Sequence, residues 1–494
     1  MNAPDLKSRV LASLWNVVDG EDSILSATLA GSFADTGALR TVSDIDLILI
    51  LNRLDAPLYD RLLKVFDEAL APVMSEAGYR LKINPTLGPL KFNDPSTAVL
   101  HLMLYSQEAH VDHCVKSPFT CLEWQQSPFV RKRSLSDIYP VFGLQPHHFF
   151  GARRSATEYL KDFKAGVISY REIVPSATGY EESARSRPMD NRDRHEFAYH
   201  IMKFLMQNFV KLVEREAVSL QGETLLSRFF EICPMDAAEH LQLFHSLSRR
   251  KQEGDFVPSE RALEDRLTRF VNDFEKQFRT LFVEDGQQNI FFRHAPTAMN
   301  GTGTFFGRTE APIRPVPPEL LNGLVTAVEK ARPTSTFVSP LGRCQQSMQL
   351  VSNCSALPSP TVDSRLAEMD YGLCEGLTGD AVRQQYPHLF AAWSRKEDPP
   401  FPGGETTGQV LDRLQLFMDG TLAAQKGNTV ICTHNVVLRC LVGSLLRVPE
   451  HEWFRLRIPH LTPIRVTYSG RFGSFLDLDE ATERHIFGAF AKEA

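Results

Sequence analysis

The sequence predicts a multidomain protein in which two α/β regions flank an all-helical region. Three observations predict this: the length of 494 residues, short apolar runs that alternate with helical spacing near both ends, and apolar residues every three or four positions between them. At about 150 residues per domain, the length corresponds to about three domains. We expect domains at residues 1–130, 131–285 and 286–494.

The composition is that of a soluble globular protein. Hydrophobic residues make up 43% and charged residues 23%, which is ordinary for a packed protein and too apolar for a disordered one. No stretch approaches the roughly 20 apolar residues of a membrane span, and the first residues lack the apolar core of a signal peptide. We therefore expect a cytoplasmic protein without a membrane partner. The eight cysteines include no C-x-x-C pair and are expected to be free thiols.

The charge argues against nucleic-acid partners. The formal net charge is -6 and no block rich in lysine or arginine occurs, whereas binding to a phosphate backbone needs a concentrated basic surface. Small-molecule substrates fit this balance better. The sequence does not determine the oligomeric state.

The first region alternates strands and helices. Residues 24–29 and 45–51 are short apolar runs rich in isoleucine and leucine, and residues 98–105 form another such run. Residues 59–77 have helical spacing. This alternation predicts an α/β unit.

The middle region is predicted to be helical. One helix is expected to begin near Arg194, with Lys203, Lys211 and Glu214 off its apolar stripe. That stripe consists of Phe197, Ile201, Leu205, Phe209 and Leu212. The polar segment at 175–193, with its prolines and small residues, is expected to be a loop between helices.

The last region repeats a strand followed at once by a helix. The strands are expected at 289–292, 336–338 and 429–432. Such repetition predicts a parallel sheet with helices on its faces, and ligands bind such sheets beyond the carboxyl ends of the strands. The residues directly after these strands are therefore candidates for a site.

A glycine, a serine and two aspartates indicate a first site. Gly31 and Ser32 end the strand at 24–29, and a Gly-Ser turn lets a polyphosphate approach backbone N–H groups and a hydroxyl. Asp44 and Asp46 lie two residues apart on a strand, hence on one face about 7 Å apart, and can together hold Mg²⁺. The alternative is that Asp44 caps a turn and Asp46 faces solvent at a sheet edge.

This pattern resembles the DNA polymerase β-type nucleotidyltransferase superfamily, in particular its aminoglycoside-type and small-molecule members. The resemblance implies an α/β nucleotidyltransferase fold, with nucleotide bound at Gly31 and Ser32 and Mg²⁺ at Asp44 and Asp46. It implies transfer of a nucleoside monophosphate from a nucleoside triphosphate to a hydroxyl or phosphate acceptor, with pyrophosphate leaving.

The third carboxylate of that superfamily is missing from its expected place. The matching strand at 98–105 offers His101 instead, and Asp94 lies a few residues before it. Three interpretations stay open. His101 acts as the base, Asp94 folds into the site, or the domain binds nucleotide without transferring it.

Cationic and imidazole groups indicate a second site. The strand at 289–292 leads into Arg293 and His294, the strand at 336–338 precedes Arg343, and the strand at 429–432 precedes His434. Arginine forks and helix N-termini both favour a dianionic phosphate. Taken singly, each of these residues is commonly an ordinary loop residue, but together they predict a phosphoryl pocket.

The same residues belong to blocks that resemble the histidine phosphatase (phosphoglycerate mutase-like) superfamily over residues 288–480. Six blocks occur in the family's order: Arg293-His294-Ala295-Pro-Thr297-Ala-Met-Asn300, Gly307-Arg308, Ser339-Pro-Leu-Gly-Arg343, Leu366-Ala-Glu368-Met-Asp-Tyr-Gly372-Leu-Cys-Glu375-Gly376, Pro402-Gly-Gly-Glu405-Thr406 and Thr433-His434. The resemblance implies a three-layer α/β histidine phosphatase fold that needs no cofactor.

The resemblance also implies roles for the residues. His294 attacks phosphorus and becomes a phosphohistidine, while Arg293, Arg343 and His434 neutralise the phosphoryl oxygens. Glu368, held in its protonated form by the negative charge of the bound phosphate, protonates the leaving alkoxide. A water molecule then attacks the phosphoenzyme.

Further residues are expected to support the pocket. Glu375 is the reserve candidate for the acid, Glu405 is expected to orient the pocket, and Asn300 to donate to a phosphate oxygen. Two positions depart from the family, since Ala295 and Asn435 stand where it has glycine. We expect both to add bulk beside the pocket and to affect substrate range more than chemistry.

The sequence therefore predicts a bifunctional enzyme, a nucleotidyltransferase followed by a phosphomonoesterase. The blocks are most similar to those of small-metabolite phosphatases such as α-ribazole phosphatase, so we expect hydrolysis rather than mutase transfer. The expected partners are a nucleoside triphosphate, a small phosphorylated metabolite and an acceptor. The alternative is a phosphatase with a non-catalytic nucleotide-binding regulatory module.

Overall fold

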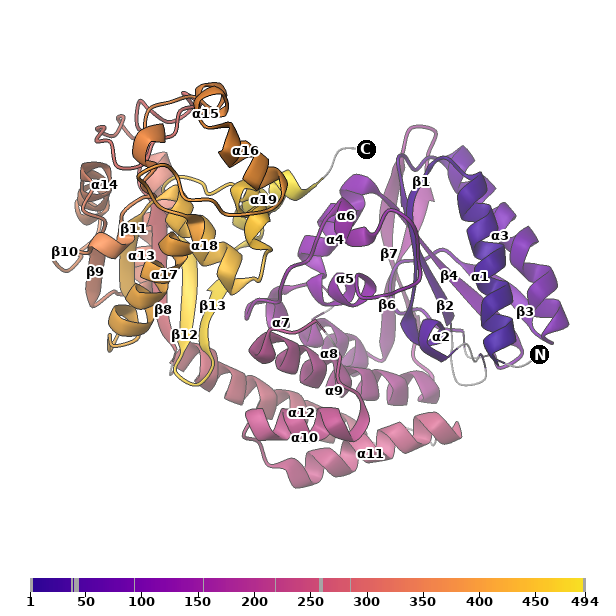
Figure 1. Cartoon of the computed structure of the whole chain (residues 1–494). Coiled ribbons are helices and arrows are strands. Elements are labelled where there is room, and N and C mark those ends of the chain that lie inside the picture. The colour runs from indigo at the N-terminus through magenta and orange to yellow at the C-terminus, as the bar shows by residue number, and fades with distance from the viewer. Residues whose placement is uncertain are drawn as a thin grey trace. The chain divides into compact units, whose positions relative to one another are not determined.

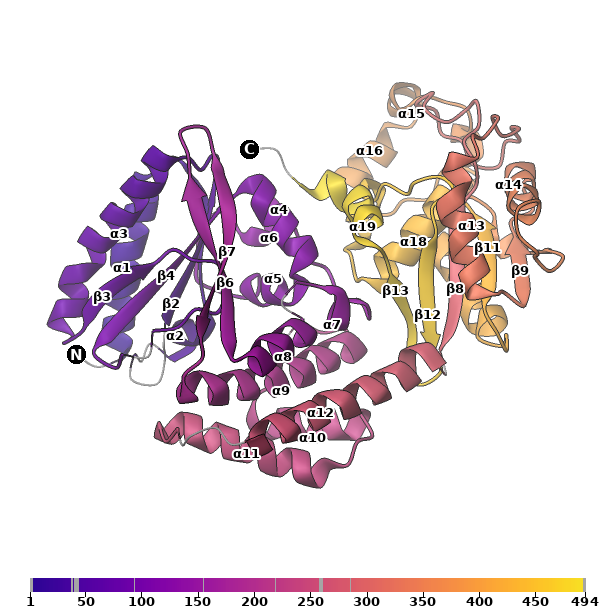
Figure 2. The ribbon, with the colours of Figure 1, turned by 180° about the vertical axis from the view of Figure 1, so that it is seen from behind.

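The computed structural model describes residues 3–36, 39, 44–92, 94–153, 155–217, 219–256, 261–284 and 286–491. The chain forms two compact units (Figures 1 and 2). The first comprises the chain up to Glu275 together with Phe490, and the second runs from Lys276 to Ala489. The first two predicted domains thus share one unit, and their division at residue 130 stays a prediction. None of the described helices is long and apolar enough to cross a membrane.

A five-stranded mixed sheet forms the core of the first unit (Figure 1). Its strands are β1 (Ile24–Ala30), β2 (Asp44–Leu51), β3 (Arg80–Asn84), β4 (Thr97–Ser106) and β5 (Val130–Lys132), in the order β3-β4-β2-β1-β5. β2 pairs parallel with β4 and antiparallel with β1. Because it is central, β2 is apolar almost throughout, and it matches a predicted strand, as do β1 and β4.

Amphipathic helices cover this sheet. They are α1 (Ala3–Gly20), α2 (Gly31–Thr36), α3 (Ala56–Glu76), α4 (Gln107–Lys116), α5 (Pro118–Trp124) and α6 (Leu135–Ile138). α1 and α3 pack together and bury apolar residues spaced by three or four positions. α3 begins where Asp55 accepts a hydrogen bond from the N–H of Leu58 (3.0 Å), with Pro57 in its first turn.

The rest of the first unit contains helices and a hairpin. Its elements are α7 (His148–Gly151), α8 (Ala156–Ala165), β6 (Val167–Pro175), β7 (Tyr180–Pro188), α9 (Asn191–Glu214), α10 (Gly222–Ile232), α11 (Ala237–Glu253) and α12 (Arg261–Arg279). α9 begins at a capping box in which Asp190 and Asp193 exchange hydrogen bonds, and it buries the whole predicted stripe.

The prediction of an all-helical middle region is wrong because β6 and β7 form an antiparallel hairpin. The predicted loop at 175–193 contains all of β7. Hydrophobic periodicity does not reveal this hairpin, because β7 is largely polar and exposed. Pairs of side chains across the two strands stabilise the hairpin. Arg171 bonds to Glu182, and Arg185 pairs with Glu172 (3.0 Å).

A six-stranded sheet forms the core of the second unit. Its strands are β8 (Gln287–Arg293), β9 (Ser335–Val338), β10 (Thr361–Val362), β11 (Thr429–Thr433), β12 (Ile464–Ser469) and β13 (Gly473–Asp477), in the order β10-β9-β11-β8-β12-β13. The first four in this order are parallel, as predicted. β12 and β13, which were not predicted, extend the sheet by two antiparallel strands.

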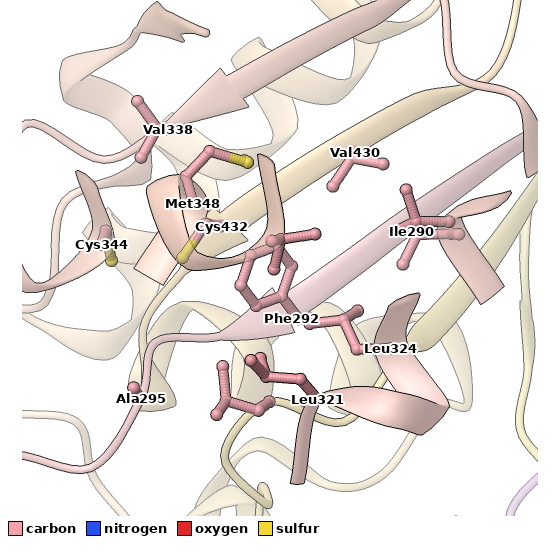
Figure 3. Packing of buried hydrophobic residues seen from close by; sticks show 13 residues of the cluster. Ile290, Phe292, Ala295, Leu321, Leu324, Val338, Cys344, Met348, Val430 and Cys432 are labelled. Atoms are coloured by element: carbon pink, nitrogen blue, oxygen red, sulfur yellow. The ribbon is translucent and has the colours of Figure 1, made fainter. Parts of the chain in front are cut away.

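Helices cover both faces of this sheet. The main ones are α13 (Glu319–Ala331), α14 (Gly342–Ser352), α15 (Gly379–Gln385), α16 (Pro387–Ser394), α17 (Thr407–Phe417), α18 (Asn435–Leu445) and α19 (Glu480–Phe487). α13 and α14 pack on one face, where Phe292 and Val430 meet Leu324 and Met348 (Figure 3). On the other face Phe337 of β9 packs edge-on against α17. This is a three-layer α/β fold.

Short turns of 3₁₀ or π helix complete the described chain. They are η1 (Thr280–Glu284), η2 (Ser364–Leu366), η3 (Gly372–Cys374), η4 (Met418–Leu422), η5 (Glu450–Arg455) and η6 (Gly488–Phe490). η1 continues α12 directly, so the boundary between the two units falls inside a helical segment.

Candidate active sites

Strand ends of the second unit bring imidazole and guanidinium groups to one edge of its sheet. Arg293 ends β8 beside Thr433 of β11, so His294 and His434 follow neighbouring strands, with ring centroids 5.1 Å apart. Arg343 lies in the first turn of α14, which follows β9. The four predicted residues thus lie together at the carboxyl ends of parallel strands, where such sheets bind ligands.

One ring nitrogen of His294 keeps a free lone pair. Its Nδ1 lies 2.7 Å from the carbonyl oxygen of Ala295, which only accepts hydrogen bonds, so Nδ1 carries the proton and Nε2 keeps a lone pair. Burial lowers the pKa of His294 well below its usual value, and the charges of Arg343 and Arg293 lower it further. The imidazole is therefore neutral at physiological pH.

Two arginines beside it are fixed by backbone carbonyls. Arg343 is 1% exposed and donates from Nη1 to Thr309 (2.9 Å) and from Nη2 to Gly307 (2.6 Å). Arg293 donates from Nη1 to Ile458 (2.9 Å), and burial lowers its pKa to about 10. Both guanidinium groups stay charged at neutral pH and have little freedom to move.

Three arginines near His294 keep buried donors unsatisfied. Within the described residues, the Nε atoms of Arg293, Arg308 and Arg343 have no hydrogen-bond partner. Buried donors of a charged group are costly without an acceptor. A phosphate group offers several acceptor oxygens and negative charge, so it satisfies this arrangement.

Glu368 lies beside these groups at the N-terminus of α18. It is 4% exposed, and its carboxylate accepts hydrogen bonds from the N–H groups of Asn435 and Val436, both 3.1 Å, and of Met369. His434 directly precedes these two donors. The carboxylate is thus fixed within electrostatic reach of Arg293 and Arg343.

Glu375 has a different task. Its Oε1 accepts hydrogen bonds from the N–H groups of Gly307 (2.8 Å) and Thr309 (2.9 Å). The carbonyl oxygens of the same two residues hold Arg343. Glu375 therefore fixes the loop that positions Arg343, a task that needs no proton transfer.

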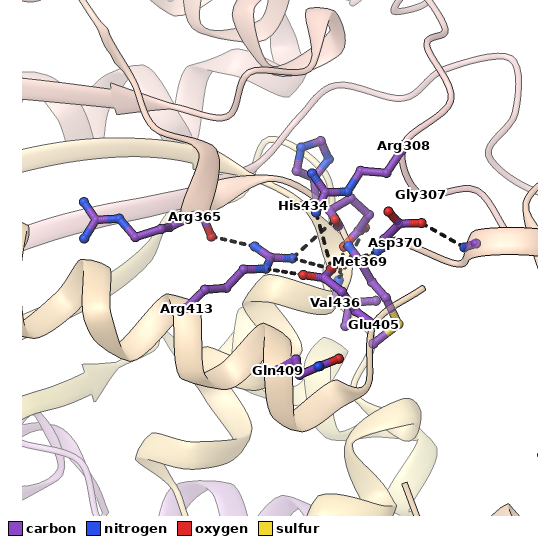
Figure 4. Close-up of polar contacts among 12 residues, drawn as sticks. Gly307, Arg308, Arg365, Met369, Asp370, Glu405, Gln409, Arg413, His434 and Val436 are labelled. Carbon is purple, nitrogen blue, oxygen red and sulfur yellow. Dashed lines mark hydrogen bonds and ion pairs between the residues drawn. The ribbon is translucent and has the colours of Figure 1, made fainter. Parts of the chain in front are cut away.

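Glu405 organises the other side of the pocket (Figure 4). It pairs with Arg413 through both oxygens (3.0 and 3.2 Å), accepts from the N–H of Asp370 (2.9 Å) and reaches Arg308 at 3.4 Å. Burial would raise the pKa of Glu405, but hydrogen bonds and the charge of Arg413 outweigh burial and lower it. The ionised carboxylate thus orients two arginines.

Asn300 and Ala295 support the backbone. The side-chain oxygen of Asn300 accepts from the N–H of Thr297 (2.7 Å), which closes the turn after His294. The methyl group of Ala295 is buried in the apolar cluster of Figure 3, so it adds no bulk to the pocket, contrary to the expectation for this position.

His460 and Arg413 also lie at this site, although they were not among the predicted residues. His460 donates from Nδ1 to the carbonyl oxygen of His294 (2.6 Å), and burial lowers its pKa to about 4. It lies in the loop before β12, a strand between β8 and β13 that was not predicted. Arg413 lies on α17, where only its spacing of eight residues from Glu405 could have suggested a pair.

In the first unit, Gly31 and the two aspartates lie together. Gly31 has a φ of +74°, and a Cβ there would lie 2.2 Å from Oδ2 of Asp46, so only glycine fits. Asp44, Asp46 and His101 each offer a ligand atom, all within 4.8 Å of one another. Ser32 follows Gly31 in the first turn of α2.

His101 is a cation in this arrangement. Its Nδ1 lies 3.0 Å from Oδ1 of Asp46 and its Nε2 lies 2.8 Å from the carbonyl oxygen of Thr86. Both partners accept hydrogen bonds, so both ring nitrogens must donate. Burial would lower the pKa of His101, but the hydrogen bond and charge of Asp46 raise it overall. A doubly protonated ring cannot act as a base.

Asp94 lies away from this group. It precedes β4, where its carboxylate bonds to Thr97 (2.7 Å) and pairs with Arg80 (2.8 Å). Thr97 lies four residues before His101 on the same strand, about 13 Å away. The interpretation that Asp94 folds into the site is therefore wrong.

Asp44 fits a cation site. It is 8% exposed, and within the described residues its Oδ1 is buried without a hydrogen-bond partner. Burial, and next the charge of Asp46, raise the pKa of Asp44 to about 6. Two carboxylates, one with an unpartnered oxygen, are donors that Mg²⁺ prefers.

Lys91 lies within electrostatic reach of Asp44 and Asp46, and further basic residues surround it. Lys91 pairs with Glu196 (3.1 Å), and the charges of both act on Asp44. The pKa of His200 is lowered to about 3 and that of Lys251 to about 8, and the charges of Lys91 and Lys203 contribute to both shifts. We call these residues, with Arg192, the Lys91 cluster: Lys91, Arg192, His200, Lys203 and Lys251. Glu196 pairs with Lys91 and Arg192, and the charge of Lys251 also acts on it.

Comparisons with known proteins concern the second unit. Residues 290–480 match the sequence profile of the histidine phosphatase superfamily (branch 1). Over 187 residues the chain is 25% identical to a "probable phosphoglycerate mutase" of Yersinia enterocolitica serotype O:8, which covers 37% of this chain and 85% of that protein. Residues 290–480 are therefore a histidine phosphatase domain with a phosphoglycerate mutase-like sequence, as predicted.

Solved structures show similarity of the same extent. A mycobacterial glucosyl-3-phosphoglycerate phosphatase is 20% identical and covers 39% of this chain and 98% of its own, with a TM-score of 0.34. YhfR of Bacillus stearothermophilus is 21% identical and covers 39% of this chain and 98% of its own, with a TM-score of 0.35.

Proposed function

We propose that the second unit hydrolyses phosphomonoesters through a phosphohistidine on His294. The observation that carries this proposal is the Nε2 lone pair of His294 next to the unsatisfied donors of Arg293, Arg308 and Arg343. Nε2 attacks phosphorus as the bond to the ester oxygen breaks. The arginines and His434 stabilise the charge that spreads over the remaining oxygens.

Glu368 completes both steps. It gives a proton to the departing alkoxide and then takes one from the water that attacks the phosphohistidine. The alcohol leaves first and inorganic phosphate leaves second, so the net reaction is hydrolysis. Mutase transfer would instead return the phosphoryl group to a second hydroxyl of the substrate.

Separate substitution of Glu368 and Glu375 by glutamine tests the assignment of Glu368 as the acid. Glu368→Gln is expected to lower kcat for phosphomonoester hydrolysis by ~10²–10⁴, because the amide cannot give up a proton to the leaving oxygen. Glu375→Gln is the matched control and is expected to change kcat less than tenfold, because the amide oxygen still accepts both loop N–H groups. Release of phosphate measures both. Equal losses in the two variants would contradict the assignment of Glu368 as the acid.

We propose, as a second activity, that the first unit transfers a nucleoside monophosphate from a nucleoside triphosphate to a small-molecule hydroxyl or phosphate. The paired Asp44 and Asp46 beside the Gly31 turn and the cations of the Lys91 cluster support it. Asp44 and Asp46 would hold Mg²⁺, which neutralises polyphosphate charge when bound. Gly31 and Ser32 would contact the phosphates, and the Lys91 cluster would attract them.

One observation favours the regulatory alternative. His101, a cation, stands where the family has its third carboxylate, and the other candidate, Asp94, lies too far away. Among the described residues, neither can take a proton from an acceptor. In this alternative the first unit binds a nucleotide without transferring it and regulates the phosphatase.

Nucleotide binding by the Lys91 cluster is expected to weaken as pH rises through about 8. The pKa of Lys251 is lowered to about 8, so its ammonium group loses its charge above that pH and no longer pairs with phosphate. We expect the Kd of a nucleoside triphosphate to rise about tenfold between pH 7 and 9.5, the loss of one charge-assisted contact. Calorimetric titration with each of the four nucleoside triphosphates at both pH values measures the Kd.

Lys251→Arg provides the matched control. The arginine keeps its charge over this range, so the Kd of the variant is expected to stay constant. A rise in Kd of the same size in Lys251→Arg would show that another group causes the pH dependence. It would exclude Lys251 from the binding site.

A further inference from the structure

A cavity of about 530 Å³ lies beside the phosphatase centre and has aromatic walls. We call it the aromatic pocket, after six of the residues that line it: Phe305, Tyr371, Trp393, Phe401, Trp453 and Phe454. They come from the loop after β8, the segment between η2 and α17, and η5. Nothing in the mechanism above uses these rings.

The pocket adjoins the acid, not the nucleophile. Two of its lining residues, Met369 and Val436, donate their backbone N–H groups to Glu368 (both 3.1 Å). A third, Arg439, follows one turn later on α18 and lies within electrostatic reach of both Glu368 and Arg293. Since Glu368 protonates the leaving oxygen, the organic part of the substrate must extend from this side.

Several rings of the aromatic pocket pack against one another. Phe401 packs at steep angles against Tyr371 (4.9 Å between centroids), Phe305 (5.4 Å) and Trp393 (5.7 Å). The first two contacts are edge-to-face, an arrangement that fixes ring orientation. Phe454 at the rim differs, because 70% of its surface is exposed. A rigid aromatic wall with an exposed aromatic edge is suited to a flat apolar ligand.

Three charged residues of the lining already have hydrogen-bond or ion-pair partners. Asp398 accepts the N–H groups of Thr407 and Gly408 at the start of α17, and Glu397 pairs with Arg395. Arg439 donates from Nε to a backbone carbonyl, which leaves the plane of its guanidinium to stack on a ring. The pocket therefore selects for flatness and apolar surface more than for charge.

We propose that the phosphatase acts on phosphomonoesters whose alcohol carries a flat aromatic group, which the aromatic pocket binds. This inference rests on the proposed phosphatase function and names its substrate class. The chemistry at phosphorus is unchanged. Binding energy from the ring instead holds the ester oxygen against Glu368.

Two matched pairs of esters test the proposal on the intact chain. Adenosine 5′-monophosphate and methyl ribofuranoside 5-phosphate share the same leaving oxygen and differ in the base. The phosphates of 2-phenylethanol and 2-cyclohexylethanol differ in flatness at similar size. We expect kcat/KM to be about 10- to 100-fold higher for the aromatic member of each pair, the usual effect of stacking on an aromatic side chain.

Substitutions in the aromatic pocket test whether the preference for aromatic esters arises there. Phe454→Ala and Trp393→Leu are expected to lower kcat/KM for the aromatic esters at least fivefold while leaving the non-aromatic esters unchanged. Leu416→Ala, which also removes an exposed apolar side chain but lies outside the pocket, is expected to change neither. Phe454 is exposed, so its removal is compatible with folding.

The outcomes separate the two proposals. Hydrolysis of all four esters without preference for the aromatic members would overturn the inference and leave the phosphatase function standing. Absence of turnover with every ester would overturn both. A preference that survives in Phe454→Ala and Trp393→Leu would show that the ring binds elsewhere.

Discussion

The variant His294→Ala is expected to lose phosphomonoester hydrolysis, with kcat reduced ~10⁴-fold or more. His294 supplies the attacking lone pair, and removal of a nucleophile costs several orders of magnitude in enzymes with covalent intermediates. The neighbouring imidazoles cannot replace it. His434 is fully buried, with Nε2 bonded to Ser339 (2.7 Å), and His460 is tied to the backbone of residue 294.

Two measurements make this result specific. Rapid quenching of the wild type with a radiolabelled ester should trap acid-labile phosphate on the chain, and His294→Ala should trap none. The control is His388→Ala, an exposed histidine of the same unit, which should keep both turnover and trapping. Hydrolysis by His294→Ala at a rate near that of the wild type would exclude the phosphohistidine mechanism.

Three residues of the second candidate site could be predicted because each of them follows a buried strand. β8, β9 and β11 are short, apolar and followed at once by loops or helices, so parallel pairing aligns their carboxyl ends. Local sequence therefore implies spatial proximity for His294, Arg343 and His434. Glu368 and Glu405 lie on loops, and only the family resemblance predicted their place.

What could not be predicted depends on polar pairing at long range. The β6–β7 hairpin is held by cross-strand ion pairs, which no hydrophobic period reveals. The hydrogen bond from the N–H of Gly307 to Glu375 joins residues 68 positions apart. The charge of His101 follows from its two acceptors, Asp46 and Thr86, which come from different segments. Each of these is set by tertiary contacts.

Asp44→Asn combined with Asp46→Asn is expected to abolish nucleotidyl transfer by the first unit, a loss of ~10³-fold or more. The two amides remove the negative charge that holds Mg²⁺, and a bound cation stabilises phosphoryl transfer by several kcal/mol. Pyrophosphate release from each nucleoside triphosphate, with a panel of phosphorylated and hydroxylated acceptors, measures the loss. Phosphate release by the second unit should be unchanged.

The same experiment decides between the two functions of the first unit. Transfer requires that the wild type release pyrophosphate only when an acceptor is present and that the double variant release none. Binding without transfer requires a measurable Kd for the nucleotide, no pyrophosphate from the wild type, and a phosphatase rate that changes when nucleotide is added. Asp94→Asn, which alters a carboxylate about 13 Å from the level of His101, is the matched control and should behave as the wild type does in both assays. His101 is a cation beside Asp46 and cannot take a proton from the acceptor. Transfer therefore depends on whether the acceptor supplies an ionised oxygen of its own. A phosphate acceptor needs no base, whereas a hydroxyl acceptor does.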